Sequence, residues 1–392
     1  MSSTSKQRGA PDFESSKNKR QKVRAAGLHP DYWYAVEHSN ALKKGKAQEV
    51  VFWEETRVAI YRDERGVVRA IEDRCAHRQL PLSIGNVKGD RIVCDYHGWE
   101  YDTEGKLAHV PHDTFGKPIP SCKVKTFAVR ERYGLIWVFF GAKDKAASVP
   151  MPEIPELEGP DAWACVPIDF TWNAHHSMII DNVSDFTHEF LHRKYKPFVN
   201  SKLTKLETKD DKVFVSYDTK VGYGKISGLF VDRKAVDTNS MELCYHYPYQ
   251  WSNTDDQIKH WCFVLPIGPQ RTRVFFLFYF KSFKVPFLPI KIPREVMEPF
   301  LKVSNRVLIR PLLSQDGVAV EAEQRGYERY FNASIAELSP AVHAFQALTV
   351  KKWEEHLAAI QSAKLVPGER LAKTARDAEG TEAPAEAMGG AE

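Results

Sequence analysis

Two short pairs of cysteine and histidine constrain this chain more than any other feature of its sequence. Cys75 and His77 are separated by one residue, and Cys94 and His97 by two. Each pair follows a β-type segment and lies in a loop with nearby glycines. Because thiolate and imidazole both bind transition metals, two such loops that face each other can enclose one metal centre. The region must therefore fold so that the two loops meet.

This set of ligands allows two kinds of metal centre. A Cys2His2 zinc site is tetrahedral and structural. A Rieske-type [2Fe–2S] cluster is bound by two thiolates at one iron and by two imidazoles at the other. The spacing favours the cluster, because each loop then supplies one cysteine and one histidine, whereas a finger-type zinc site usually groups like with like. Zinc remains the alternative.

A second group of polar residues follows later in the chain, where Asp185, His188 and His192 lie close together. The pattern predicts a helix over 175–192, on which these three side chains share one face. Two histidines four residues apart can bind one metal ion, and a polar helix face with ordinary hydrogen bonds is the alternative. A carboxylate as third ligand would complete the two-histidine, one-carboxylate set that leaves positions on Fe(II) open for oxygen.

The apolar pattern predicts two domains with polar ends. Residues 1–30 are polar and basic and predict a disordered arm. Residues 31–150 contain short β-type runs between turns, which predict an all-β domain. Residues 151–365 begin with a proline-rich linker and predict an antiparallel sheet over 203–280 with flanking helices. The fold class is therefore α+β, and the tail 366–392, which lacks large apolar side chains, is predicted to be disordered.

Composition excludes several classes of protein. Of the 392 residues 43% are hydrophobic, which is enough to build two cores. The formal net charge is only +4, with much of the excess in the first 24 residues, so no basic face for nucleic acid is indicated. The six cysteines are too dispersed for a disulfide framework, and no apolar run reaches the ~18 residues of a membrane helix. Without the apolar core of a secretion signal, a cytoplasmic protein is expected.

The segments 75–81 and 94–99 resemble the cluster-binding loops of the Rieske non-haem iron oxygenases, which include the α subunits of ring-hydroxylating dioxygenases and oxidative demethylases. The resemblance implies a Rieske domain over 31–150 and a catalytic non-haem iron domain over 151–365. It also implies that a [2Fe–2S] cluster and a mononuclear Fe(II) are bound, the cluster by Cys75, His77, Cys94 and His97 and the Fe(II) by His188 and His192. Segment 314–324 resembles the family's C-terminal helix, which assigns the third iron ligand to Asp316. By position alone Asp316 also fits a helix N-cap.

Two further roles come from the resemblance. Asp185 matches the family's bridging carboxylate, which connects an iron-ligating histidine of its own subunit to a cluster-ligating histidine of a neighbour. Here it would join His188 to His77 or His97 of an adjacent chain and so give electrons a short path. This arrangement implies a homotrimer. Asn182 matches a family position near the iron.

The resemblance further implies a terminal oxygenase that depends on O2 and NAD(P)H. The chain has no Gly-x-Gly-x-x-Gly pattern and no plant-type Cys-x4-Cys-x2-Cys pattern, so a separate reductase, with or without a ferredoxin, is expected to supply the electrons. An aromatic-rich second domain favours hydroxylation, by a monooxygenase, of a bulky apolar substrate of aromatic, terpenoid or steroid-like type. The sequence leaves open oxidative O- or N-demethylation and dioxygenation.

Two hypotheses from other classes remain. One is an electron-transfer Rieske protein without oxygenase activity, and the other is a zinc-stapled binding module. Segment 287–310 mixes apolar with basic residues and is interpreted as a helix packed on the sheet, with a lipid-surface or substrate-entry helix as the alternative.

Overall fold

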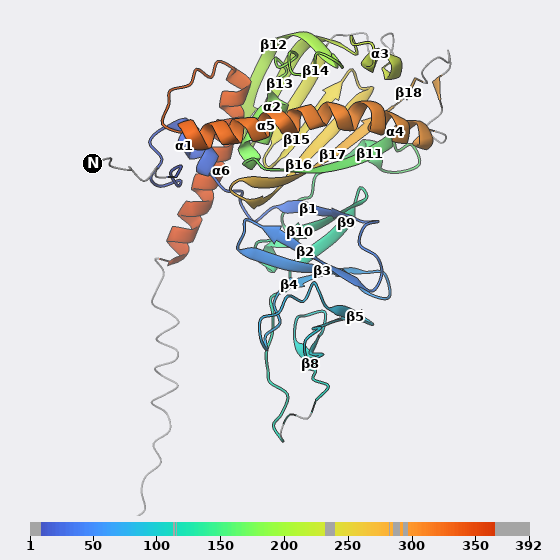
Figure 1. Cartoon of the computed structure of the whole chain (residues 1–392), viewed down its shortest axis with the longest axis vertical. Coiled ribbons are helices and arrows are strands. Elements are labelled where there is room, and N and C mark those ends of the chain that lie inside the picture. The colour runs from blue at the N-terminus through green and yellow to red at the C-terminus, as the bar shows by residue number, and fades with distance from the viewer. Residues whose placement is uncertain are drawn as a thin grey trace, which may run out of the picture.

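The computed structural model describes residues 9–112, 114, 116–231, 240–281, 283–284, 291–292 and 297–364. In these residues a smaller part built of strands lies against a larger part, in which helices cross a broad sheet (Figure 1). The predicted α+β architecture is therefore confirmed, with the all-β part first in the chain. The predicted tail 366–392 lies outside the described residues, as do positions 287–290 and 293–296 of segment 287–310.

The N-terminal part consists of three small antiparallel sheets. The first has the order β1-β10-β9, the second β2-β3-β4, and the third, at the far tip in Figure 1, β5-β6-β7-β8. Their bounds are β1 Trp33–His38, β2 Lys46–Phe52, β3 Thr56–Arg62, β4 Val68–Glu72, β5 Asn86–Lys88, β6 Arg91–Val93, β7 Glu100–Tyr101, β8 Leu107–His109, β9 Ala128–Arg132 and β10 Leu135–Phe139. The tip has a small core of its own, in which Tyr61, Leu82, Ile92 and Tyr101 pack around two buried cysteines.

The larger part is built on one antiparallel sheet of seven strands, in the order β11-β17-β16-β15-β14-β13-β12. Its strands are β11 Ala164–Trp172, β12 Phe198–Lys209, β13 Lys212–Val221, β14 Ser240–His246, β15 Tyr249–Thr254, β16 Ile258–Gly268 and β17 Arg271–Phe280. This confirms the sheet predicted over 203–280 and adds β11, which pairs with β17 along its whole length. The short elements of the chain are η1 Lys143–Ala147, η2 Pro155–Leu157, α3 Ser227–Phe230, β18 Phe283–Lys284 and β19 Lys291–Ile292.

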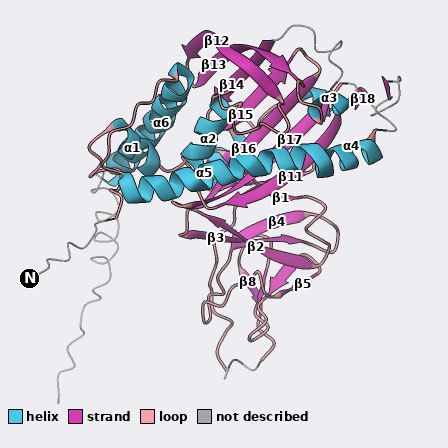
Figure 2. Cartoon of the chain, turned by 45° about the horizontal axis from the view of Figure 1, so that its top comes forward, coloured by secondary structure: helices cyan, strands magenta, loops and turns pink. Residues whose placement is uncertain are grey.

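One long helical run crosses the sheet and carries the C-terminal half of the site (Figure 2). It begins with α4 Glu298–Ser304, continues through a π-helical turn, η4 Asn305–Ile309, and ends with α5 Arg310–Tyr330. Pro299 lies in the first turn of α4, where a missing N–H costs no hydrogen bond, and Pro311 follows directly after the π-helical turn. The remaining helices are α2 His176–Ser184 and α6 Pro340–Lys364. Within the described residues no helix is long and apolar enough to span a membrane; the cytoplasmic location stays a prediction.

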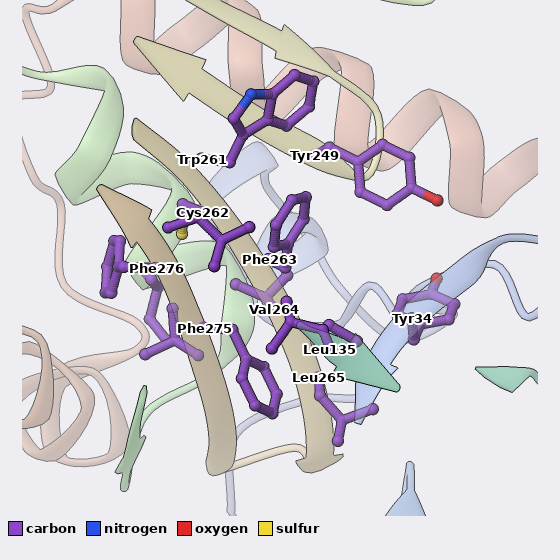
Figure 3. Packing of buried hydrophobic residues seen from close by; sticks show 14 of the residues in the cluster. Tyr34, Leu135, Tyr249, Trp261, Cys262, Phe263, Val264, Leu265, Phe275 and Phe276 are labelled. Atoms are coloured by element: carbon purple, nitrogen blue, oxygen red, sulfur yellow. The ribbon is translucent and has the colours of Figure 1, made fainter. Parts of the chain in front are cut away.

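The two parts share one hydrophobic core. Residues of β1 and β10 belong to the same buried cluster as residues of β16 and β17. Trp137 packs edge-on against Phe263 at a centroid distance of 4.8 Å, and the Tyr249 hydroxyl donates to the Trp33 carbonyl at 2.8 Å. Figure 3 shows Phe263 and Leu265 of β16 beside Leu135 of β10. This continuous apolar contact fixes the orientation of one part relative to the other.

The structure differs from the prediction of a disordered arm over 1–30. Residues Lys19–Ala25 form a helix, α1, whose first turn is capped by Asn18. The Arg24 guanidinium is buried and donates to Asp181 at 2.6 Å and to Glu323 at 2.8 Å, which connects α1 to α2 and α5. The predicted arm included Arg24, because the acidic partners of this residue are far away in the sequence.

We expect Arg24→Ala to lower the free energy of unfolding by about 3 kcal/mol, because Asp181 would stay buried without its cationic partner. The measurement is the midpoint of urea unfolding, followed by tryptophan fluorescence. Lys22→Ala is the matched control on the same helix: its ion pair with Glu354 is exposed, and its loss should change the free energy by less than about 1 kcal/mol. Equal midpoints for the two variants would contradict the docking of α1.

Candidate metal sites and the cavity beside them

The two Cys–His loops at the tip of the N-terminal part have the same backbone geometry. Cys75 N donates to Leu80 O at 2.8 Å, and Cys94 N donates to Trp99 O at 2.9 Å, in each case five residues along. The cysteine carbonyls accept in the same way, Cys75 O from Gln79 N and Cys94 O from Gly98 N, both at 2.9 Å. Each loop is therefore a closed turn that presents one cysteine and one histidine at a fixed separation.

The loops bring the four predicted ligands together with sulfur inside and imidazole outside. Cys75 and Cys94 are 1% and 2% exposed, whereas His77 is exposed and His97 half-buried. The imidazole rings lie 4.5 Å apart, centroid to centroid. Burial raises the pKa of the Cys94 thiol, and so does the neighbouring thiol of Cys75, although the backbone N–H groups of Tyr96 and His97 oppose the shift.

A tyrosine that the sequence reading did not select supports this site. The Tyr101 hydroxyl lies 3.2 Å from Cys75 Sγ and accepts a hydrogen bond from Ala76 N at 2.9 Å. With its N–H partner already in place, the hydroxyl can donate its own proton to a thiolate. Paired buried thiols, paired outer imidazoles and this donor fit a [2Fe–2S] group bound through sulfur on its inner side and nitrogen on its outer side.

The second group of predicted ligands also converges, but not on one helix face. α2 ends at Ser184, and Asp185, the residue that follows, turns its side chain to accept from Thr187 N at 2.9 Å and from the Thr187 hydroxyl at 2.7 Å. In a continued helix that N–H would bond to the Val183 carbonyl, so the aspartate competes with the helix and stops it. The prediction of a helix over 175–192 is therefore wrong beyond residue 184. The histidines that follow lie in turns.

Asp316 comes to these histidines from α5. His188 Nε2 and His192 Nε2 lie 3.5 and 3.3 Å from Asp316 Oδ1, and the three ligand atoms are all within 4.8 Å of one another. Asp316 lies inside α5 rather than at its start, so the N-cap interpretation is wrong. Two imidazoles and one carboxylate on one side of a cavity can hold an ion such as Fe(II) and leave coordination positions open.

Neighbouring amides orient two of these ligands. Gln315 Oε1 lies 3.0 Å from His192 Nδ1, and Asn182 Nδ2 donates to Asp316 Oδ1 at 3.2 Å. Burial lowers the pKa of His192, but the hydrogen bond and charge of Asp316 outweigh it and raise the pKa overall. Burial lowers the pKa of His188 in spite of the same aspartate. Asp316 thus attracts positive charge to this point, which a metal cation could supply.

The two groups of ligands do not meet within one chain. The Cys–His loops belong to the tip built of β5 to β8, whereas α2 and α5 pack with the large sheet, away from that tip (Figures 1 and 2). Asp185 is only half-buried, and together with His188 it lines a polar cavity of about 620 Å³ between α1, α2 and α5. That cavity leaves Asp185 accessible from outside the chain.

A second, apolar cavity of about 170 Å³ begins at the three ligands and extends between the sheet and the long helix. Its walls are mainly aromatic and aliphatic, and they include Phe198, Phe276, Phe278, Leu308 and Leu312. The sequence analysis did not select the polar pair in its wall, Ser252 and His260. The alternation of residues along β16 could have placed His260 on an inner face of the sheet. Its neighbours could not be predicted in this way, because they belong to other strands and are known only once the sheet register is known.

Comparisons with known proteins match both regions of the chain, the one with the Cys–His loops and the one with His188, His192 and Asp316. The family described as the Rieske [2Fe-2S] domain matches residues 32–127, and the family described as the vanillate O-demethylase oxygenase C-terminal domain matches residues 172–359. The 4beta-methylsterol monooxygenase of Methylococcus capsulatus is 41% identical over 348 residues, which cover 88% of this chain and 94% of that protein.

Two further proteins are similar over different lengths. The vanillate O-demethylase oxygenase subunit of a Pseudomonas species is 36% identical over 134 residues, about a third of either chain. Among solved structures, dicamba monooxygenase bound to dicamba superposes with a TM-score of 0.68 over 85% of this chain and all of that one, at 21% identity. This last likeness concerns the fold alone.

We expect Gly317→Ala to displace Asp316. A Cβ atom at Gly317 would lie 2.4 Å from Trp172 Nε1 of β11, so α5 would have to move away from the sheet. The variant should be about 1–3 kcal/mol less stable and should retain less of any metal held at His188, His192 and Asp316. Thermal unfolding and metal analysis of the purified protein measure both effects.

Gly326→Ala on the same helix is the matched control, because nothing lies within 4 Å of its added Cβ. It should raise stability by about 0.5–1 kcal/mol through helix propensity and leave the metal content unchanged. If Gly317→Ala behaves like Gly326→Ala, close packing of α5 on β11 does not position the aspartate.

Proposed function

The chain belongs to the Rieske non-haem iron oxygenases, and from that premise we propose that it is a monooxygenase for a bulky, apolar, sterol-like substrate. As a terminal oxygenase of this family it is an oxidoreductase with a Rieske [2Fe–2S] cluster and a mononuclear iron, and a separate reductase supplies its electrons. The observation that carries the proposed substrate is the apolar cavity beside His188, His192 and Asp316. The similarity of this chain to a methylsterol monooxygenase over 88% of its length supports it.

We assign the ligands as the resemblance in sequence implied. The convergence of each set in the structure supports the assignment. The cluster ligands are Cys75, His77, Cys94 and His97, and the iron ligands are His188, His192 and Asp316. When bound, the two groups supply single-electron transfer and the activation of O2.

The protein's own residues have three tasks in this proposal. Gln315 and Asn182 hold His192 and Asp316 in position through the contacts described above. The apolar walls exclude water and enclose the substrate, which strengthens polar interactions inside the cavity. Asp185, beside His188 and open to the outside, is the bridge to a cluster-binding histidine of a neighbouring chain.

In a ring of three chains, Asp185 of one chain would contact a cluster-binding histidine of the next chain. One chain places its Cys–His tip far from α2, so electrons need a second chain to reach the mononuclear site over a short path. The accessible position of Asp185 supports a homotrimer in which each tip reaches the next chain. Oxidative O-demethylation is the second candidate reaction, favoured by the match of residues 172–359 to the vanillate O-demethylase domain.

We expect the purified wild-type protein to be red-brown and to contain about three irons per chain. His188→Ala should contain about two, with the absorption of the cluster unchanged, because only the mononuclear site loses a ligand. His109→Ala, an exposed histidine in β8, is the control and should keep all three. Metal analysis and visible spectra decide the outcome: a colourless zinc protein would support the zinc module, and two irons in the wild type would support the electron carrier.

The proposed reaction is tested with the reduced enzyme system, a 4-methylsterol and ¹⁸O2. We expect product with one labelled oxygen atom, coupled to NAD(P)H oxidation. Asp185→Asn should keep its iron and cluster yet lose most of this turnover, because the amide has one acceptor oxygen where the carboxylate has two, one for the N–H of each imidazole.

Asp210→Asn, in the exposed turn between β12 and β13, is the control and should turn over normally. Full activity in Asp185→Asn would remove the bridging role. Two labelled atoms in the product, or the loss of a methyl group as formaldehyde, would identify dioxygenation or demethylation instead.

A further inference from the structure

The apolar cavity contains a polar pair, a buried serine hydroxyl and a half-buried imidazole, that no part of the metal chemistry uses. Ser252 of β15 and His260 of β16 are directly opposite each other in the sheet. The Ser252 hydroxyl lies 2.6 Å from His260 Nδ1 and 3.4 Å from Nε2, and both residues line the cavity together with Asp316. The imidazole lies beside the ring of Phe278, at a centroid distance of 4.9 Å. An apolar wall that contains a hydroxyl and an imidazole must satisfy them, and Ser252 satisfies only one ring nitrogen at full strength.

The described residues of the cavity wall offer no cationic side chain to an anion. Among its described lining residues there is no lysine and no arginine, and the one carboxylate is Asp316, beside the two histidines. A carboxylate or sulfonate on the substrate would lose its hydration without gaining a cationic partner, which is far more costly than burying a hydroxyl. The cavity therefore favours uncharged substrates over substrates that carry a carboxylate or a sulfonate.

His260 does not replace the missing cation. Burial lowers the pKa of its imidazole to about 4, so the ring is neutral at physiological pH. A neutral imidazole has one N–H donor and one acceptor nitrogen, and a serine hydroxyl can also donate or accept. Such a pair matches a hydroxyl group, which needs a donor and an acceptor at one point. Thr254, two residues from Ser252 on the same strand and also in the wall, adds a second hydroxyl nearby.

We propose that Ser252 and His260 bind the hydroxyl group of an otherwise apolar, uncharged alcohol and so determine which of its carbons faces His188, His192 and Asp316. This inference rests on the proposed oxygenase function and adds to it a substrate class, an uncharged bulky alcohol, and the residues that recognise it. The sheet register fixes both residues relative to the iron ligands, because β15 and β16 are inner strands of the same sheet on which α5 packs. A hydroxyl held there leaves the carbon skeleton to fill the space between the pair and the metal ligands.

The test is equilibrium binding to the iron-loaded enzyme under anaerobic conditions without reductant, followed by tryptophan fluorescence. Two pairs of probes differ only in a hydroxyl: a 4-methylsterol with its 3-deoxy counterpart, and 4-tert-butylbenzyl alcohol with 4-tert-butyltoluene. The sulfate ester of the sterol tests the exclusion of anions. The wild type should bind the alcohol of a pair about tenfold more tightly than the hydrocarbon, the effect of one buried hydrogen bond, and the sulfate most weakly.

Two variants remove the polar pair in different ways. His260→Phe and Ser252→Ala should bind alcohol and hydrocarbon with nearly equal affinity, while iron content and circular dichroism stay those of the wild type. His260→Gln, which keeps a donor and an acceptor, should restore part of the preference. His246→Phe, on β14 and outside the cavity, is the control and should bind as the wild type does.

The outcomes separate this inference from the proposed function. Suppose that 4-tert-butylbenzyl alcohol binds more tightly than 4-tert-butyltoluene, that this preference depends on His260, and that no sterol binds. Then the role of Ser252 and His260 is supported and the proposed sterol-like substrate is wrong. If the wild type binds alcohol and hydrocarbon equally in both pairs, or if the sulfate binds best, the inference is overturned. A preference for alcohol that survives in both His260→Phe and Ser252→Ala overturns it as well.

Discussion

The catalytic half of this molecule depends on how closely the long helix approaches the sheet. Gly317 of α5 lies directly over Trp172 of β11, with no room for even one methyl group between them. The next residue toward the N-terminus is Asp316, so this contact fixes the height at which its carboxylate meets two histidines from the other end of the domain. Because packed interiors do not deform continuously, this distance is set by the shape of the core and not by the metal. The ligand set is thus partly organised before any ion binds.

The opposite end of the chain constrains the same site. Arg24 of α1 pairs with Asp181 of α2 and Glu323 of α5, so one buried guanidinium holds together the two helices that supply or orient the proposed iron ligands. A buried arginine with two carboxylates is often less stable than a well-packed apolar contact in the same place. Its hydrogen bonds nevertheless fix one relative position of the helices, whereas an apolar contact allows several. We infer that the N-terminal segment contributes to the position of α2 and therefore of Asn182 and Asp185.

The sequence predicted best what is local and worst what depends on distant partners. The cysteine and histidine of each loop are two or three residues apart, so spacing alone selected them as candidate ligands, and the β-type runs around them predicted the domain. The helix expected over 175–192 ended at residue 184, because the side chain of Asp185 captures an N–H that the helix needed, a competition that hydrophobic periodicity does not record. Asp316 was selected only by resemblance, since nothing in its neighbourhood distinguishes it from other carboxylates. Arg24 and His260 were missed because their partners are remote in sequence or on the next strand.

The division of labour within the catalytic domain follows from this architecture. The proposed iron ligands come from the segment after α2 and from α5, whereas the polar pair of the cavity comes from β15 and β16. A substitution in the strands can therefore change which substrate is held without moving the ligands, provided that the sheet keeps the face on which α5 packs. The converse does not hold, because a shift of α5 moves Asp316 and one wall of the cavity together. Substrate choice is consequently the more adjustable property of this fold, and its iron chemistry the more constrained one.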